Sequence, residues 1–263
     1  GDRVIIYMPM IPEAVIAMLA TARLGAVHSV VFGGFAPHEL ATRIDDCTPK
    51  CIVSASCGIE PGRLVPYKPL LDAAIDHAAH KPDHCVIFQR PMAEAEMVAG
   101  RDLDWQAVEA AAAPADCVEV EATDPCYILY TSGTTGRPKG AVLAQPAMIA
   151  NAVMSHHAYA MTADDVVLNL LPLFHVGGLN IQPLPALLAG AGVVIHDGFD
   201  PAAVLAAIGS EGITQMTVVP TILGALIGTP AWQTADLSSL RMMAIGSTDV
   251  PVALIEAVHA RGI

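Results

Sequence analysis

The chain has 263 residues, of which 54% are hydrophobic and 15% charged, and its formal net charge is −13 at pH 7. This composition excludes an intrinsically disordered chain, because disorder requires low hydrophobicity. The acidic balance, with only 13 Lys and Arg residues, excludes nucleic acid and anionic membranes as main partners, because neutralising phosphates requires clustered cations. A nucleotide site remains compatible with this charge, since local backbone N–H groups and one or two cations suffice to bind it.

Short β-branched runs alternate with amphipathic stretches along the chain, which is typical of βαβ units. We therefore predict an α/β fold with two mostly parallel sheets and flanking helices. The expected strands cover 3–8, 27–32, 51–55, 85–88, 126–130, 166–170, 192–196, 215–219 and 242–245. The expected helices cover 12–24, 37–46, 69–79, 146–160, 201–208, 221–227 and 251–259. We expect a helical spacer over 91–124, and hence a first subdomain at 1–124 and a second at 125–263.

No Asp, Glu, Lys or Arg occurs between Asp165 and Asp197, a length that fits a membrane span. Proline and glycine residues interrupt this stretch, so we expect a buried strand, turn and helix and no membrane span. The six cysteines form no CxxC pair with matching histidines, which predicts reduced thiols and no metal site. The first ten residues lack the features of a signal peptide, so we expect a cytoplasmic protein.

A glycine-rich segment, YTSGTTGRPKG from Tyr130 to Gly140, follows the strand expected at 126–130. Glycines allow close backbone approach, while N–H groups, hydroxyls and a lysine suit polyphosphate oxygens. Pro138 stands where a P-loop has its second glycine, so the segment is not an ordinary P-loop. A surface turn without a ligand is the alternative. We predict a phosphate-binding loop made of Thr131, Ser132, Gly133, Thr134, Thr135, Gly136 and Lys139.

The same segment resembles the phosphate-binding signature of the ANL superfamily. This superfamily contains acyl- and aryl-CoA synthetases, luciferases of the firefly type and the adenylation domains of peptide synthetases. The resemblance covers essentially the whole chain. It implies the α/β fold of the ANL N-terminal domain, a site for ATP, Mg²⁺, CoA and a small-molecule carboxylic acid, and a catalytic role for Lys139.

Two early segments, residues 1–44 and SCGIEPGRLVPYKPLLDAAI over 56–75, resemble the acetyl- and propionyl-CoA synthetases. That resemblance implies that Phe32, Gly33 and Gly34 lie along the CoA path and that Arg63 contacts the CoA 3′-phosphate, for which a guanidinium group is suited. Glu60 departs from the pattern, because acetyl-CoA synthetases tend to have a second arginine there. Without the resemblance, the two glycines would be read as a plain turn and Arg63 as an exposed cation.

A later segment, LPLFHVGGLN over 171–180, resembles the medium- and long-chain acyl or aryl-CoA ligases. It implies that His175 lines the carboxylate and acyl pocket and has a catalytic role; a core histidine is the alternative. His156 and His157 are expected to be helix-surface residues. Because the resemblance changes branch near the glycine-rich segment, we expect the second half to set a preference for medium-chain or aromatic acids.

The segment over 240–250 aligns with a Gly-Gly-Ala-Pro loop that flanks the adenine in the superfamily. This chain has Gly246, Ser247, Thr248 and Asp249 there. The resemblance implies that Gly246 and Ser247 contact the adenine. A connection between strand and helix without a ligand is the alternative.

Together these resemblances imply an AMP-forming acyl-CoA synthetase, an acid-thiol ligase that activates a carboxylic acid as its acyl-adenylate and transfers it to CoA. The superfamily's magnesium-binding glutamate, ribose-binding aspartate and C-terminal lid lysine have no counterpart in this sequence. We therefore expect a fragment with negligible thioester-forming activity of its own. An inactive nucleotide-binding remnant and an adenylation domain of another ANL type are the alternatives.

Overall fold

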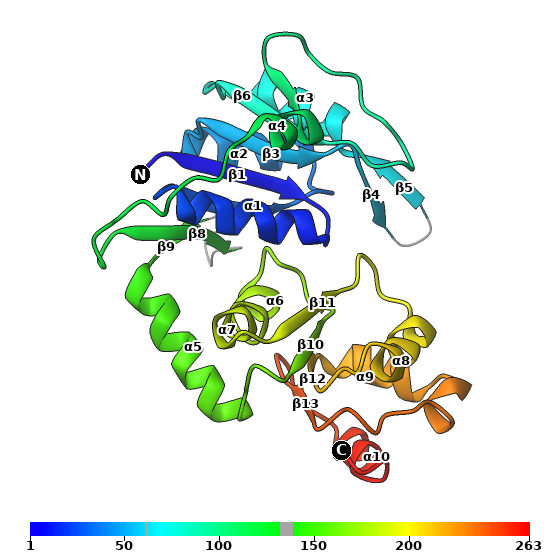
Figure 1. The fold of residues 1–263 in the computed structure, drawn as a ribbon. Coiled ribbons are helices and arrows are strands. Elements are labelled where there is room, and N and C mark those ends of the chain that lie inside the picture. The colour runs from blue at the N-terminus through cyan, green and yellow to red at the C-terminus, as the bar shows by residue number, and fades with distance from the viewer. Residues whose placement is uncertain (61–62, 132–138) are drawn as a thin grey trace. The chain divides into compact units, whose positions relative to one another are not determined.

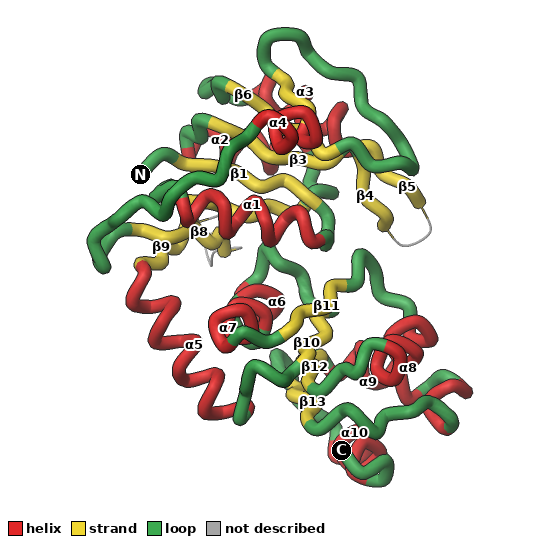
Figure 2. Tube along the Cα trace, in the orientation of Figure 1, coloured by secondary structure: helices red, strands yellow, loops and turns green. Residues whose placement is uncertain are grey.

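The computed structural model describes residues 1–60, 63–131 and 139–263. The chain forms two compact units, Gly1–Ala147 and Met148–Ile263, whose helices, strands and loops are drawn in Figure 1 and Figure 2. The predicted α/β fold with two mostly parallel sheets is confirmed. The boundary between the units lies later than the expected 124/125, because the strands on either side of the glycine-rich segment pair with the first sheet.

The first unit is built on a seven-stranded sheet with the order β7-β6-β3-β1-β2-β8-β9. All neighbouring strands are parallel except β8 and β9, which are antiparallel. The strands are β1 (Arg3–Met8), β2 (Val27–Phe32), β3 (Cys51–Ala55), β6 (His84–Phe88), β7 (Asp102–Asp104), β8 (Pro125–Thr131) and β9 (Lys139–Ala144). A separate antiparallel hairpin consists of β4 (Cys57–Glu60) and β5 (Arg63–Pro66).

Helices cover both faces of this sheet. They are α1 (Pro12–Arg23), α2 (Pro37–Cys47), α3 (Tyr67–His77) and the short α4 (Trp105–Ala111). Ile5 and Tyr7 of β1 are fully buried in one apolar cluster with residues of α2 and α3. Ile6 alternates to the opposite face and is also fully buried, where α1 packs on β1 and β2. Both faces of the central strands are therefore apolar, as parallel sheets require.

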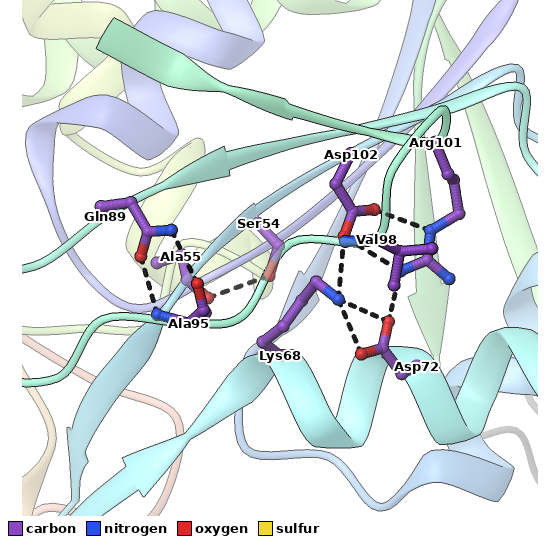
Figure 3. A network of polar contacts seen from close by, with 9 residues as sticks. All are labelled: Ser54, Ala55, Lys68, Asp72, Gln89, Ala95, Val98, Arg101 and Asp102. Carbon is purple, nitrogen blue, oxygen red and sulfur yellow. Dashed lines mark hydrogen bonds and ion pairs between the residues drawn. The ribbon is translucent and has the colours of Figure 1, made fainter.

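A cluster of four charged side chains holds α3 against β7 (Figure 3). The Lys68 ammonium lies 2.9 Å from the Asp102 carboxylate, and these two side chains are 3% and 0% exposed. Lys68 also pairs with Asp72 at 2.6 Å, while Arg101 pairs with both aspartates. Two positive and two negative charges balance, which offsets the cost of burying each one.

The second unit contains a four-stranded, fully parallel sheet with the order β11-β10-β12-β13. The strands are β10 (Val166–Asn169), β11 (Gly192–Ile195), β12 (Gln215–Val218) and β13 (Met242–Ile245). The helices are α5 (Gln145–Tyr159), which begins at the unit boundary, α6 (Val176–Leu179), α7 (Pro183–Ala189), α8 (Pro201–Ser210), α9 (Pro220–Ile227), the 3₁₀ turn η1 (Pro230–Gln233) and α10 (Val252–His259). The core joins Leu168, Met216 and Val218 of the strands to residues of α8, α9 and η1.

An ion pair ties the strand starts of this second sheet together. Arg241 lies 2.7 Å from the buried carboxylate of Asp165 and donates to the carbonyl oxygens of Tyr159 and Ala160 at the end of α5. Thr214 donates its hydroxyl to Asp165 at 2.6 Å. Although burial opposes it, these hydrogen bonds hold the pKa of Asp165 well below its usual range, so the carboxylate stays charged.

Several predicted elements are confirmed and one is wrong. The strands expected at 3–8, 27–32, 51–55 and 242–245 have the predicted bounds. The expected helical spacer over 91–124 is helical only at α4. Within this stretch β7 adds a strand to the edge of the sheet, and the residues after α4 form a loop (Figure 2). No helix within the described residues is long and apolar enough to cross a membrane.

Candidate functional site

Four of the predicted ligand-binding residues of the first unit lie where its parallel strands end. β2 runs parallel to both β1 and β8, so the ends of β2 and β8 share one edge of the sheet. Phe32 is the last residue of β2 and is followed by Gly33 and Gly34, whereas β8 ends at Thr131. Ligands of open α/β sheets bind outside the carboxyl ends of the strands, which is the edge at which these residues gather.

The glycine-rich segment connects β8 to β9. Thr131 and Lys139 are directly opposed in the antiparallel pairing of these strands, and both are exposed. The hairpin therefore brings a hydroxyl and an ammonium group to the two ends of the segment. The remaining predicted members of the phosphate loop lie outside the described residues; they are Ser132, Gly133, Thr134, Thr135 and Gly136.

Tyr130, the first residue of this segment, contacts two charged side chains of α2. Its hydroxyl donates to the Asp46 carboxylate, and the Arg43 guanidinium lies 5.4 Å from its ring centroid. Burial and the Asp46 hydrogen bond raise the pKa of Tyr130, so the phenol stays protonated. Tyr130 was not among the predicted phosphate-binding residues, and its position as the first residue of the glycine-rich segment was the available sequence signal.

Gly33 and Gly34 each have a side chain of the same unit in the space that a Cβ would take. A Cβ atom at Gly33 would lie 2.0 Å from the Tyr67 ring, and one at Gly34 would lie 2.2 Å from a Glu60 carboxylate oxygen. Both distances are shorter than real Cβ contacts. The absence of side chains at this turn is thus explained by Tyr67 and Glu60, while the CoA contact predicted here remains a prediction.

Arg63 lies on the β4–β5 hairpin at a shallow depression of about 440 Å³. The depression is lined by Gly34, Arg63, Leu64, Val65, Pro66, Pro69 and Leu70. The Arg63 side chain is 72% exposed and pairs with Glu60 at 3.0 Å. The structure therefore brings Arg63 and Gly34 to one surface, but the carboxylate that replaces the second arginine occupies the guanidinium.

In the second unit, His175 lies beyond the end of β10, directly before α6. Its side chain is exposed, which contradicts the alternative of a core histidine. The Gly177 N–H donates to its Nδ1 at 3.0 Å, so a neutral ring carries its proton on Nε2. Gly178 is required here, since a Cβ would lie 2.2 Å from the Leu171 carbonyl oxygen.

The other predicted residues of this unit follow β13. Gly246 donates its N–H to the Val218 carbonyl at 3.3 Å, next to the end of β12. Ser247 has φ 77°, a left-handed conformation that costs a residue with a Cβ roughly 1–2 kcal/mol. The superfamily pattern has glycine at this position, so the structure explains that glycine by backbone geometry.

The second unit contains a buried polar layer that was not predicted from the sequence. Gln182 precedes α7 and Gln215 opens β12; their side chains hydrogen-bond at 3.3 Å and are 1% and 0% exposed as residues. The Thr217 hydroxyl is also buried, without a hydrogen-bond partner among the described residues. The strand order reverses between β10 and β12, and such switch points favour ligand binding. Gln182, a polar residue inside the mostly apolar stretch between Asp165 and Asp197, was the sequence signal.

These segments match a known family. A family model described as AMP-binding enzyme matches residues 1–263. The chain belongs to the AMP-binding enzyme family. The predicted resemblance to the acyl-CoA synthetases of the ANL superfamily is thereby confirmed.

Three relatives of this AMP-binding chain come from different organisms. An uncharacterized protein of Pseudomonas aeruginosa is 48% identical over 86% of the chain. The mitochondrial acyl-CoA synthetase short-chain family member 3 of Rattus norvegicus is 44% identical over 86% of the chain. The indoleacetate–CoA ligase of Aromatoleum aromaticum is 41% identical over 96% of the chain. The chain spans 37%, 34% and 46% of these relatives' lengths, respectively.

Proposed function

We propose that the protein carrying this AMP-binding chain is an AMP-forming acid–CoA ligase. The observation that carries the proposal is the family match over all 263 residues, and the placement of the predicted residues at the carboxyl edges of the two sheets supports it. In the first half-reaction, a carboxylate oxygen attacks the α-phosphorus of ATP and pyrophosphate leaves. In the second, the CoA thiol loses its proton, its sulfur attacks the acyl carbon, and AMP leaves.

The first half-reaction requires phosphate charge to be held and neutralised rather than covalent help from the protein. We assign this to the glycine-rich segment. Lys139 and Thr131 are both exposed and directly opposed, so an ammonium and a hydroxyl group flank the segment. These donors suit phosphate oxygens rather than a metal cage, and Mg²⁺ therefore fits as the ion that accompanies ATP and neutralises its charge.

His175 is our candidate for holding the acid. Because its Nδ1 accepts a hydrogen bond from Gly177, its Nε2 is the donor of the neutral ring. An Nε2 donor can orient a carboxylate oxygen for attack. We propose Gly246 and Ser247 for the adenine, and Phe32, Gly33, Gly34 and Arg63 for CoA.

The cysteine side chains indicate the compartment. The six cysteines are free thiols, and Cys47, Cys57 and Cys85 are buried. Thiols persist in reducing compartments, so we propose the cytoplasm.

Acid-dependent exchange of radioactive pyrophosphate into ATP tests the adenylation step. We would measure it on the protein at its natural length with C2 to C12 and aromatic acids. Lys139→Ala and Gly136→Val should lower the exchange strongly, whereas Lys81→Ala, a matched lysine change far along the chain from the segment, should not. Unchanged exchange in both loop variants would refute the loop assignment.

Assays on the same protein distinguish the proposed ligase from two alternatives, a nucleotide-binding remnant and an adenylating enzyme of another type. A remnant would bind ATP in calorimetry without any exchange. An adenylating enzyme of another type would exchange pyrophosphate but form no acyl-CoA. Arg63→Ala should raise the CoA requirement and abolish discrimination between CoA and dephospho-CoA; retained discrimination would exclude Arg63 as the phosphate contact.

A further inference from the structure

Tyr67 lies between two glycines that come from different parts of the first unit. A Cβ atom at Gly33, after β2, would lie 2.0 Å from its ring, and a Cβ at Gly58, on β4, would lie 2.0 Å from its hydroxyl oxygen. The ring therefore fills the side-chain space of both positions. No other aromatic ring among the described residues has this relation to two glycines.

Tyr67 is itself firmly held. It is the first residue of α3, 1% exposed, and its N–H donates to the Ser56 carbonyl at 3.0 Å. Its ring centroid lies 5.5 Å from that of Tyr7. Tyr7 in turn donates its hydroxyl to the Phe35 carbonyl at 3.0 Å, just beyond the turn. Two buried tyrosines, Tyr7 and Tyr67, thus pack against the glycine turn.

The same ring connects the turn to the β4–β5 hairpin. Gly58 pairs with Val65 across the hairpin, and Val65 lines the depression that also contains Gly34 and Arg63. A shift of the Tyr67 ring would therefore move both the turn and the strand that bears the guanidinium. Interiors packed this closely transmit such shifts.

We propose that Tyr67 is a positioning residue for CoA: its ring sets the relative placement of the turn at Phe32–Gly34 and of the hairpin bearing Arg63. The inference rests on the proposed function, because it concerns the second half-reaction. The ring touches the two elements proposed to bind CoA. Its loss should impair CoA use and spare adenylation.

The test uses Tyr67→Leu in the protein at its natural length. We expect the KM for CoA to rise about tenfold, because displacements of the order of 1 Å are enough to cost large factors, while pyrophosphate exchange changes less than about twofold. Leu71→Ala is the matched control. Leu71 lies one turn later on α3 and is 0% exposed in the same core cluster. Its truncation destabilises the core, and the atoms nearest to a Cβ at either glycine belong to Tyr67 and not to Leu71.

A double-mutant cycle tests the contact itself. Gly33→Ala should raise the KM for CoA when Tyr67 is present, but should add little in the Tyr67→Leu background, where the added methyl has room. If Tyr67→Leu fails to fold, Gly58→Ala replaces it, since its methyl would displace the same ring, and its CoA KM is compared with that of Leu71→Ala in the same way.

Equal losses in both half-reactions, or an equal rise of the CoA KM in Leu71→Ala, would overturn the inference and leave Tyr67 as an ordinary core residue. An unchanged CoA KM in Tyr67→Leu would overturn it as well. If the unmutated protein exchanges no pyrophosphate, the proposed function fails instead. CoA binding measured by calorimetry on the same variants then decides the positioning role: weaker binding only in the Tyr67 and glycine variants supports it, and equal binding overturns it.

Discussion

Both units contain a mostly parallel sheet packed against helices, but they bury different polar groups. The first unit buries full charges, with Lys68 and Asp102 almost entirely enclosed. The second buries the amides of Gln182 and Gln215 and the carboxylate of Asp165, whose partner Arg241 is 39% exposed. The first unit should therefore be the more sensitive to any change that unbalances charge, since an uncompensated buried charge costs more than an unpaired amide.

Two glycines, one in each unit, exclude a side chain for different reasons. At Gly33 the obstacle to a side chain is the Tyr67 ring, whereas at Gly178 it is the backbone carbonyl oxygen of Leu171 at 2.2 Å. A ring can be removed by a second substitution, but a backbone carbonyl cannot. Alanine at Gly33 is therefore rescuable, and alanine at Gly178 is not.

The largest expected effect is the loss of the buried ammonium in the first unit. Lys68→Met leaves the Asp102 and Asp72 carboxylates with Arg101 alone, and should lower the free energy of unfolding by about 4 kcal/mol. Urea unfolding at pH 7 measures it. The control Lys50→Met removes an exposed pair with Asp2 and should change nothing measurable. If Arg241→Met in the second unit costs more than Lys68→Met, the contrast between the units is wrong.

Acid should weaken the first unit before the second. Burial lowers the pKa of His28 to about 4 from 6.5, so the unfolded chain binds the proton more readily. The resulting stability is complete above pH 6.5 and is lost as the pH falls toward 4, by about 3 kcal/mol at pH 4. The pKa of Asp165 in the second unit is also lowered, and its contribution is lost only below about pH 4.

Urea unfolding between pH 6.5 and pH 4, followed by a spectroscopic probe placed in each unit, measures how much stability each unit loses. His28→Leu should flatten the loss of stability between pH 6.5 and 4. A variant that keeps the full acid dependence in this window would show that another group is responsible.

A smaller effect is expected at the strained turn of the second unit. Ser247→Gly should raise the free energy of unfolding by about 1 kcal/mol, because glycine adopts φ 77° without a Cβ penalty. Ser247→Ala keeps the Cβ and should bring no gain. A gain in the alanine variant would mean that the serine hydroxyl, rather than φ, causes the strain.

The smallest steps are expected in the choice of acid. If the second unit sets that choice, each added methylene should lower the activation free energy by roughly 0.8 kcal/mol and so raise kcat/KM in pyrophosphate exchange about fourfold, up to the length of the pocket. Medium-chain or aromatic acids should then exceed propionate. Arg63→Ala, in the first unit, should leave this order unchanged. A clear preference for acetate or propionate would show that the first unit or another part of the protein decides.

The sequence by itself determined the fold class and most strands. The runs at 3–8 and 51–55 carry the β-branched and apolar residues of strands buried on both faces, and the structure has them with the predicted bounds. The glycine-rich segment and the signatures around Gly33 and His175 likewise indicated the AMP-binding family. Such information is local, because the pattern is set by neighbouring residues along the chain.

Tertiary structure alone decided which distant residues meet. β9 has no strand pattern stronger than that of a loop, and it becomes a strand because its backbone completes the edge of β8. Similarly, Lys68 and Asp102 are 34 positions apart in the sequence, and Tyr67 reaches Gly33 across another 34. Their pairing depends on how α3 packs against the sheet, and contacts between separate elements leave no periodic signal in a single sequence.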